Sequence, residues 1–136
     1  MIPDPLRSAA LNANPLVRYA SAATLCAFIV VVSLTPDTSA PGDTVFVWLV
    51  QKTPSMVQNA MHVVLYGSLT VLCAWALSRR RAVAISAIFA VLLGAGLEWL
   101  QLFVPGRYGT LFDVALNAFG ALLGAALASR WAAEAG

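Results

Sequence analysis

Four long apolar stretches constrain the fold more than any other feature of this sequence. They cover residues 17–34, 60–77, 82–104 and 111–131. Each is close to the roughly 20 residues that a helix needs to cross a hydrocarbon core of about 30 Å. Backbone polar groups inside lipid must find hydrogen-bond partners within their own segment, so these stretches should be helices. The sequence therefore predicts an all-α fold, an integral membrane four-helix bundle.

The charge content supports a membrane protein and excludes other classes. Only 10% of the residues are charged and 60% are hydrophobic, whereas soluble domains are about 25% charged. The net charge of +2 is small, and no basic run is long enough to follow a phosphate backbone, which argues against a nucleic-acid partner. Cys26 and Cys73 each lie inside an apolar stretch without metal-binding spacing. We expect neither a metal nor a cofactor.

The distribution of Lys and Arg predicts how the bundle is oriented. With the N-terminus in the cytoplasm, only Lys52 and Arg107 lie outside, as the positive-inside rule favours. The charges on the inner side are then Arg7, Arg18, Arg79, Arg80, Arg81 and Arg130. This predicts an N-in/C-in protein with cytoplasmic tails at 1–16 and 133–136. The membrane domain is residues 17–132, with an extracytoplasmic loop at 35–59.

Two segments allow a further interpretation. Residues 44–51 carry Trp48 among several apolar residues and could lie along the outer interface. The first apolar stretch could be a cleaved signal peptide, with Thr-Ser-Ala at 38–40 as the cleavage site. Because three more stretches follow and its apolar run is long for a signal peptide, we expect it to stay as an anchor.

The informative side chains are polar residues inside or at the edges of the apolar stretches. Most occur in pairs three or four positions apart, which places each pair on one helix face. Because consecutive helices alternate direction, all of them fall at one depth near the outer surface. A charge at the centre of a membrane helix costs about 2.5–3.5 kcal/mol, so it needs a partner or a purpose. The predicted polar cluster comprises His62, Tyr66, Glu98, Gln101, Arg107, Asp113 and Asn117.

A stripe of small residues continues the polar face of the fourth stretch. Below Asp113 and Asn117 the same face carries Gly120, Gly124 and Ala128. Small residues at such spacing let two helices approach closely. We therefore expect this face to point into the bundle and to hold the helices together.

The polar motifs and their spacing resemble the VanZ-like family of small membrane proteins, named for a protein associated with resistance to the glycopeptide teicoplanin. The resemblance covers roughly residues 33–136, and the family's acidic and basic pair before the helical histidine is replaced here by Gln58 and Asn59. It implies a multi-pass protein of the bacterial cytoplasmic (inner) membrane, but no reaction. It is carried by His62-x-x-x-Tyr66, Glu98-x-x-Gln101, Pro105-Gly106-Arg107, Asp113-x-x-x-Asn117 and Gly120-x-x-x-Gly124.

Each charged member of the cluster has a functional and a structural interpretation. Glu98 either handles protons or ligands, or forms a salt bridge to Arg107. Arg107 either clamps a phosphate or carboxylate, which its planar fork suits, or pairs with Glu98 or Asp113. Asp113 is most simply an acid that stabilises the N-terminus of a helix. His62 is either a general base or a hydrogen-bond partner of the two acids, and a lone histidine is a poor metal site.

The uncharged members are interpreted more simply. Gln101 and Asn117 are expected to join helices by hydrogen bonds. Tyr66 is expected to be a core aromatic residue with a polar tip.

Three functional hypotheses remain open from the sequence. The first is a non-enzymatic envelope protein whose outer pocket binds a membrane lipid, a lipid-linked envelope precursor or a partner membrane protein. The second is a membrane enzyme that uses His62 and Glu98 as an acid–base pair on a lipid head group. The third is a purely structural or assembly role. No nucleophile elbow, phosphate loop or metal-ligand spacing is present in the sequence, and nothing indicates the oligomeric state.

Overall fold

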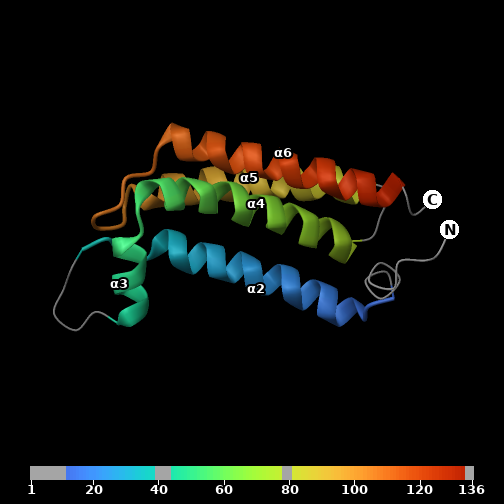
Figure 1. Ribbon diagram of the computed structural model, residues 1–136, viewed down its shortest axis with the longest axis horizontal. Coiled ribbons are helices and arrows are strands. Elements are labelled where there is room, and N and C mark those ends of the chain that lie inside the picture. Colours follow the sequence, from blue (N-terminus) through green and yellow to red (C-terminus); the bar gives the residue numbers. More distant parts are fainter. Residues whose placement is uncertain (1–11, 39–43, 78–80, 134–136) are drawn as a thin grey trace.

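The computed structural model describes residues 12–38, 44–77 and 81–133, and every regular element within them is an α-helix (Figure 1). Four helices of this part of the chain are long and apolar enough to cross a membrane. The predicted all-α fold with four membrane-spanning helices is therefore confirmed, whereas the N-in/C-in orientation stays a prediction. The long helices are α2 (Pro15–Leu34), α4 (Ser55–Leu77), α5 (Ala82–Gln101) and α6 (Leu111–Ala133), and α3 (Val45–Lys52) is short.

The helices differ from the apolar stretches mainly at their ends. α2 begins slightly earlier, at a proline, where the Asn14 side chain accepts a hydrogen bond from the Leu16 N–H at 2.9 Å. This is ordinary N-capping, with proline in the first turn. α4 begins at Ser55, ahead of the predicted start at 60, and α5 ends at Gln101, ahead of the predicted end at 104. Apolar stretches report burial in lipid, whereas caps and turns determine where helices begin and end.

Some sequence-based predictions fall outside the described residues. They are most of the two cytoplasmic tails, the charges Arg7, Arg79 and Arg80, and positions 39–40 of the alternative cleavage site. The segment predicted for the interface forms α3, which lies across one end of the bundle (Figure 1). We call this end, which also carries the α5–α6 connection at 102–110, the turn end.

The long helices run side by side, and consecutive ones are antiparallel (Figure 1). α4 and α6 therefore run in the same direction, and they make the most extensive contact in the bundle. α5 packs against both of them, and α2 packs against α4 and α5. α4, α5 and α6 thus form a three-helix core to which α2 is added on one side.

Glycines allow the backbones of α4 and α6 to touch. A Cβ added at Gly120 would collide with the carbonyl oxygen of Val63, and one added at Gly124 would collide with that of Gly67. The two pairs are the same number of positions apart in the sequence, as expected for parallel helices in a constant register. Ala128, the next small residue of the stripe, is partly buried. The α4–α6 contact is thus a small-residue contact of the kind that packs membrane helices.

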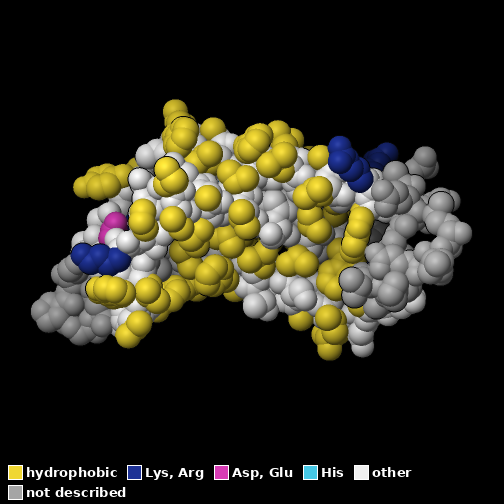
Figure 2. Space-filling view, in the orientation of Figure 1, with side chains coloured by type: hydrophobic (Ala, Val, Ile, Leu, Met, Phe, Trp, Pro, Cys, Tyr) yellow, Lys and Arg dark blue, Asp and Glu magenta, His cyan; other side chains and the backbone are white. Residues whose placement is uncertain are grey.

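The surface is apolar along the length of the helices. In Figure 2 hydrophobic side chains cover the middle of the visible face, and the Lys and Arg side chains gather near its two ends. Leu92 is 66% exposed and Leu122 is 64% exposed. Such an apolar belt between charged ends fits a molecule that is surrounded by lipid, not water.

Gly124→Ala should destabilise the bundle, whereas Gly96→Ala should not. The first change places a methyl group against the Gly67 backbone, and the second places one in open space. Overpacking of this kind costs about 1–3 kcal/mol. The thermal unfolding midpoint of each variant in the same detergent measures the difference. Equal midpoints for the two variants would contradict the tight α4–α6 contact.

Candidate functional site

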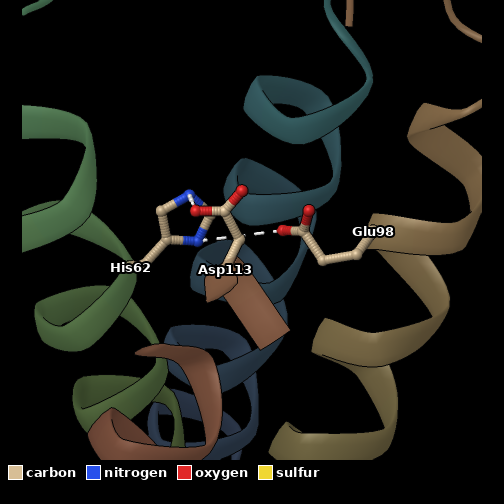
Figure 3. Close-up of side chains that lie close together, drawn as sticks. All are labelled: His62, Glu98 and Asp113. Atoms are coloured by element: carbon tan, nitrogen blue, oxygen red, sulfur yellow. Dashed lines mark ion pairs between the residues drawn. The ribbon is translucent and has the colours of Figure 1, made fainter. Parts of the chain in front are cut away.

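Three titratable side chains from three helices converge at the turn end. His62 comes from α4, Glu98 from α5 and Asp113 from α6, and their side chains point toward one another (Figure 3). His62 Nδ1 lies 3.9 Å from Glu98 Oε1, and His62 Nε2 lies 4.0 Å from Asp113 Oδ1. We call these three residues the polar triad. The histidine stands between two carboxylates.

Asn117 of α6 contacts both His62 and Glu98. Its Oδ1 lies 2.7 Å from His62 Nδ1, and its Nδ2 donates to Glu98 Oε1 at 3.5 Å. An amide oxygen only accepts hydrogen bonds, so His62 carries a proton on Nδ1 and is the donor. Asn117 is completely buried, and Gly94 of α5 leaves the space that its side chain occupies.

Thr110 joins the two acids and begins α6, a role that our sequence analysis missed. Its backbone N–H donates to Glu98 Oε2 at 3.4 Å, and its hydroxyl donates to Asp113 Oδ2 at 2.6 Å. The same hydroxyl accepts from the Asp113 N–H at 3.1 Å. The pattern Thr-x-x-Asp before an apolar run resembles a capping box, and that signal was present in the sequence. Gly109 allows the turn to pack on α5, since a Cβ there would collide with the Glu98 carbonyl.

Arg107 bonds to the end of α2, and not to the acids. Its Nε donates to the Thr35 carbonyl at 2.9 Å and its Nη2 donates to the Val32 carbonyl at 3.1 Å. Among the described residues no ion pair joins it to Glu98 or Asp113. The interpretation of Arg107 as an ion-pair partner of Glu98 or Asp113 is therefore corrected. The last carbonyls of a helix lack partners within the helix and carry partial negative charge, which attracts a guanidinium.

Gln101, the last residue of α5, also bonds to α2. Its Nε2 donates to the Ser33 carbonyl at 3.1 Å. Gln101 therefore lies beside the polar triad but bonds away from it, toward α2. Of the seven residues of the predicted cluster, Arg107 and Gln101 hold α2, and His62, Glu98, Asp113 and Asn117 contact one another.

Tyr66, the seventh residue, lies one turn further along α4 from His62. It is only 2% exposed, and its hydroxyl makes no hydrogen bond that meets ordinary geometry with any described residue. The Ser33 side chain is the polar group beside it. A buried hydroxyl gains free energy from a hydrogen-bond partner, and Ser33 is the neighbour within the described chain that can supply one.

A cavity of about 80 Å³ opens between α2 and α4 next to these residues. Gln101 of α5 contributes to its wall. Polar and apolar side chains both line the cavity, and they alternate along α4 from Gln58 to Tyr66. The polar lining is Ser33, Thr53, Gln58, His62, Tyr66 and Gln101, and the apolar lining is Ile29, Val32, Met61 and Leu65.

The charges of the polar triad do not balance within the described chain. Two carboxylates face one histidine, and the described ion pairs of both acids are with that histidine alone. Glu98 is 4% exposed, and a buried carboxylate needs a compensating charge or strong hydrogen bonds. The arrangement therefore favours a proton or a cation between the acids.

Arg107→Lys should lower stability even though the positive charge is kept. A lysine ammonium is a point charge and cannot reproduce the planar fork that contacts two carbonyls. The loss of one charged hydrogen bond costs about 1.5–3 kcal/mol, measured by thermal unfolding in detergent. Arg130→Lys is the matched control, because Arg130 is exposed near the end of α6. Unchanged stability of Arg107→Lys would mean that charge alone matters at this position.

Comparison with known proteins places the chain in a family. A model of the VanZ/LLP1 family matches residues 11–132. No curated protein and no solved structure matches the chain. The match includes all four long helices, apart from the last residue of α6, and every residue of the polar triad. The chain is a multi-pass, all-helical membrane protein that belongs to the VanZ/LLP1 family.

Proposed function

We propose that this protein binds the polar head group of a membrane lipid or of a lipid-linked cell-envelope component in the cavity between α2 and α4. The observation that carries the proposal is the Tyr66 hydroxyl, which is buried at the cavity wall beside Ser33 and makes no hydrogen bond of ordinary geometry among the described residues. A hydroxyl or carbonyl of a head group would supply a partner. Typical ligand pockets have volumes of about 300–1,000 Å³, so a cavity of about 80 Å³ would take the polar end of a head group and not a whole lipid.

The order of side chains along the cavity supports an amphiphilic ligand. On α4, Gln58 and His62 lie nearer the turn end than Leu65. On α2, Ser33 lies nearer that end than Ile29. On α2 the lining therefore changes from polar to apolar away from the turn end, whereas on α4 polar and apolar residues alternate as far as Tyr66. A lipid, with its polar head group and apolar chains, fits such a mixed lining.

The chemistry of the lining favours a head group rich in hydroxyl or amide groups. Ser, Thr, Gln and Tyr side chains supply both donors and acceptors. No Lys or Arg lines the cavity within the described residues, and the two acids of the polar triad stand behind His62. A site that recognised phosphate alone would need cations around it. Head groups that carry sugars or short peptides suit this lining better.

The family and the charge pattern support binding at the outer side of the membrane. With both termini inside, the turn end faces outward across the bacterial cytoplasmic membrane, where lipid-linked envelope components are exposed. A link to glycopeptide susceptibility belongs to the same proposal, since such drugs act on the outer side. A changed inhibitory concentration of teicoplanin upon expression of the chain, lost with the cavity variants below, would support that link.

Tyr66→Phe should weaken lipid retention about 2- to 10-fold without destabilising the protein. The change removes one hydroxyl that makes no hydrogen bond of ordinary geometry among the described residues, and a single hydrogen bond contributes about 0.5–1.5 kcal/mol. Native mass spectrometry of the protein with bound lipid measures the retention. Ser86→Ala is the matched control. Ser86 of α5 carries a buried hydroxyl that makes no hydrogen bond among the described residues, and it does not line the cavity. Equal retention by the two variants would contradict the proposal.

The choice of lipid separates head-group recognition from simple solvation by acyl chains. Delipidated protein is mixed with a glycosyl diacylglycerol and with phosphatidic acid of the same acyl chains. The proposal expects the glycolipid to be retained and to depend on Tyr66. Equal retention of both lipids, independent of Tyr66, would leave the cluster with a structural role only.

Catalysis on the head group is the second candidate, and the geometry of His62 favours it. Because Nδ1 donates to Asn117, the lone pair of a neutral imidazole is on Nε2, which faces Asp113. A histidine with one nitrogen fixed and the other free can act as a general base. His62 also lines the cavity in which the head group would bind.

If the protein is an enzyme, His62→Gln and Glu98→Gln should abolish conversion of the head group. Removing a general base lowers the rate about 10²- to 10⁴-fold, and lipid mass spectrometry over time measures it. Thr24→Val, on the part of α2 away from the cavity, is the control. Unaltered lipids after prolonged incubation with the natural protein would exclude this candidate for the lipids tested.

A further inference from the structure

We propose that the polar triad binds a divalent cation of the Zn²⁺ or Mn²⁺ type. His62, Glu98 and Asp113 each offer one ligand atom, and these atoms lie within 4.8 Å of one another. The three residues come from three different helices, so a bound ion would join α4, α5 and α6 at the turn end (Figure 3). This inference does not depend on a lipid in the cavity.

The separations suit one ion after a closure of about 1 Å. Metal bonds to His nitrogen and carboxylate oxygen are about 2.0–2.2 Å long, so ligand atoms around a tetrahedral ion lie about 3.3–3.6 Å apart. The distance from His62 Nε2 to Asp113 Oδ1 is 4.0 Å. The ligand atoms of the whole group lie within 4.8 Å of one another, so the three side chains must draw together around the ion. Side-chain rotation of the partly exposed Asp113 contributes to this closure.

The contact between His62 and Asn117 has the form of a support for a metal ligand. Metal-binding histidines donate their second ring N–H to an oxygen that orients the ring and selects the tautomer. Here Nδ1–H donates to Asn117 Oδ1 at 2.7 Å. Nε2 is left with its lone pair on the side of Asp113. This second observation is independent of the convergence of the acids.

Glu98 points to an absent partner for a different reason. It is 4% exposed, yet both of its hydrogen bonds are long, 3.4 Å from Thr110 N and 3.5 Å from Asn117 Nδ2. Hydrogen bonds to a carboxylate are ordinarily about 2.7–2.9 Å. A buried carboxylate held this loosely gains from a cation at bonding distance. Arg107 does not serve as that cation, since its described contacts are with α2.

The ligand types indicate the class of ion, and the exposure of two of the ligands allows an ion to reach the site. One imidazole with two carboxylates mixes the ligand that suits Zn²⁺ with the ligands that suit Mn²⁺. The side chains of His62 and Asp113 are 22% and 20% exposed, so an ion can reach the site from the turn end. Three protein ligands leave coordination positions for water or for a ligand oxygen. The spacing of Cys and His residues in the sequence predicted no metal site. In the structure, carboxylates from two other helices would supply the remaining ligands.

The test uses the full chain in phosphatidylcholine nanodiscs, purified through a histidine-free tag and stripped with EDTA. Zn²⁺ is titrated by calorimetry, and Mn²⁺ by electron paramagnetic resonance. One saturable site per chain is expected. Asp113→Asn and His62→Gln should each weaken binding at least about 10-fold, because each removes a ligand and even supporting groups change affinity about 10- to 100-fold. Asp37→Asn is the matched control, an exposed acid at the same end.

A second readout needs no substitution. The chain has a single histidine, so a nitrogen coupling in the spin-echo spectrum of bound Mn²⁺ identifies His62 as the ligand even where a variant fails to fold. Observing this coupling supports the site. The proposal is overturned by the absence of saturable binding, or by bound Mn²⁺ without a nitrogen coupling. It is equally overturned if Asp113→Asn and Asp37→Asn bind alike, which would indicate an adventitious ion only.

Discussion

The contact between the backbones of α4 and α6 is the interaction on which the rest of this structure depends. Gly120 and Gly124 allow α6 to lie directly on the carbonyl oxygens of Val63 and Gly67. In a membrane, where lipid tails are as apolar as the helix surfaces, such close van der Waals contact is a main source of helix association. The contact also sets the register of two parallel helices. Asn117, three residues before Gly120, is thereby placed against His62, the neighbour of Val63.

The polar network at the turn end follows from that register. Asn117 bonds to both His62 and Glu98, and Gly94 makes room for it against α5. Polar groups that are buried in an apolar bundle contribute specificity when their partners are present and cost stability when they are not. Glu98 with its long hydrogen bonds and Tyr66 with none among the described residues are the two places where the network is incomplete. Glu98 belongs to the polar triad and Tyr66 lines the cavity, so both incomplete positions lie at the candidate site.

The sequence was sufficient to predict the four helices, because apolar length is a one-dimensional property that lipid imposes. It also placed the polar residues at one depth, since helix spacing and alternating direction require no knowledge of packing. The partner of Arg107 could not be predicted in this way. Opposite charges suggested Glu98 or Asp113, but the turn at 102–110 places the guanidinium at the last carbonyls of α2. Thr110 was predictable from its capping pattern, whereas the cavity depends on how α2 meets α4 and is not encoded in any local motif.

Two arginines attach α2 to its neighbours at its opposite ends. Arg107 bonds to the carbonyls of Val32 and Thr35 at the turn end, and Arg18 Nη1 donates to the Trp75 carbonyl of α4 near the other end. Between them α2 is the least buried of the four spans, and the cavity lies along its inner side near the turn end. α2 is therefore attached to the rest of the bundle near both of its ends. Because Arg107 bonds to the carbonyl of Val32, a residue of the cavity lining, the attachment at the turn end also fixes one wall of the cavity.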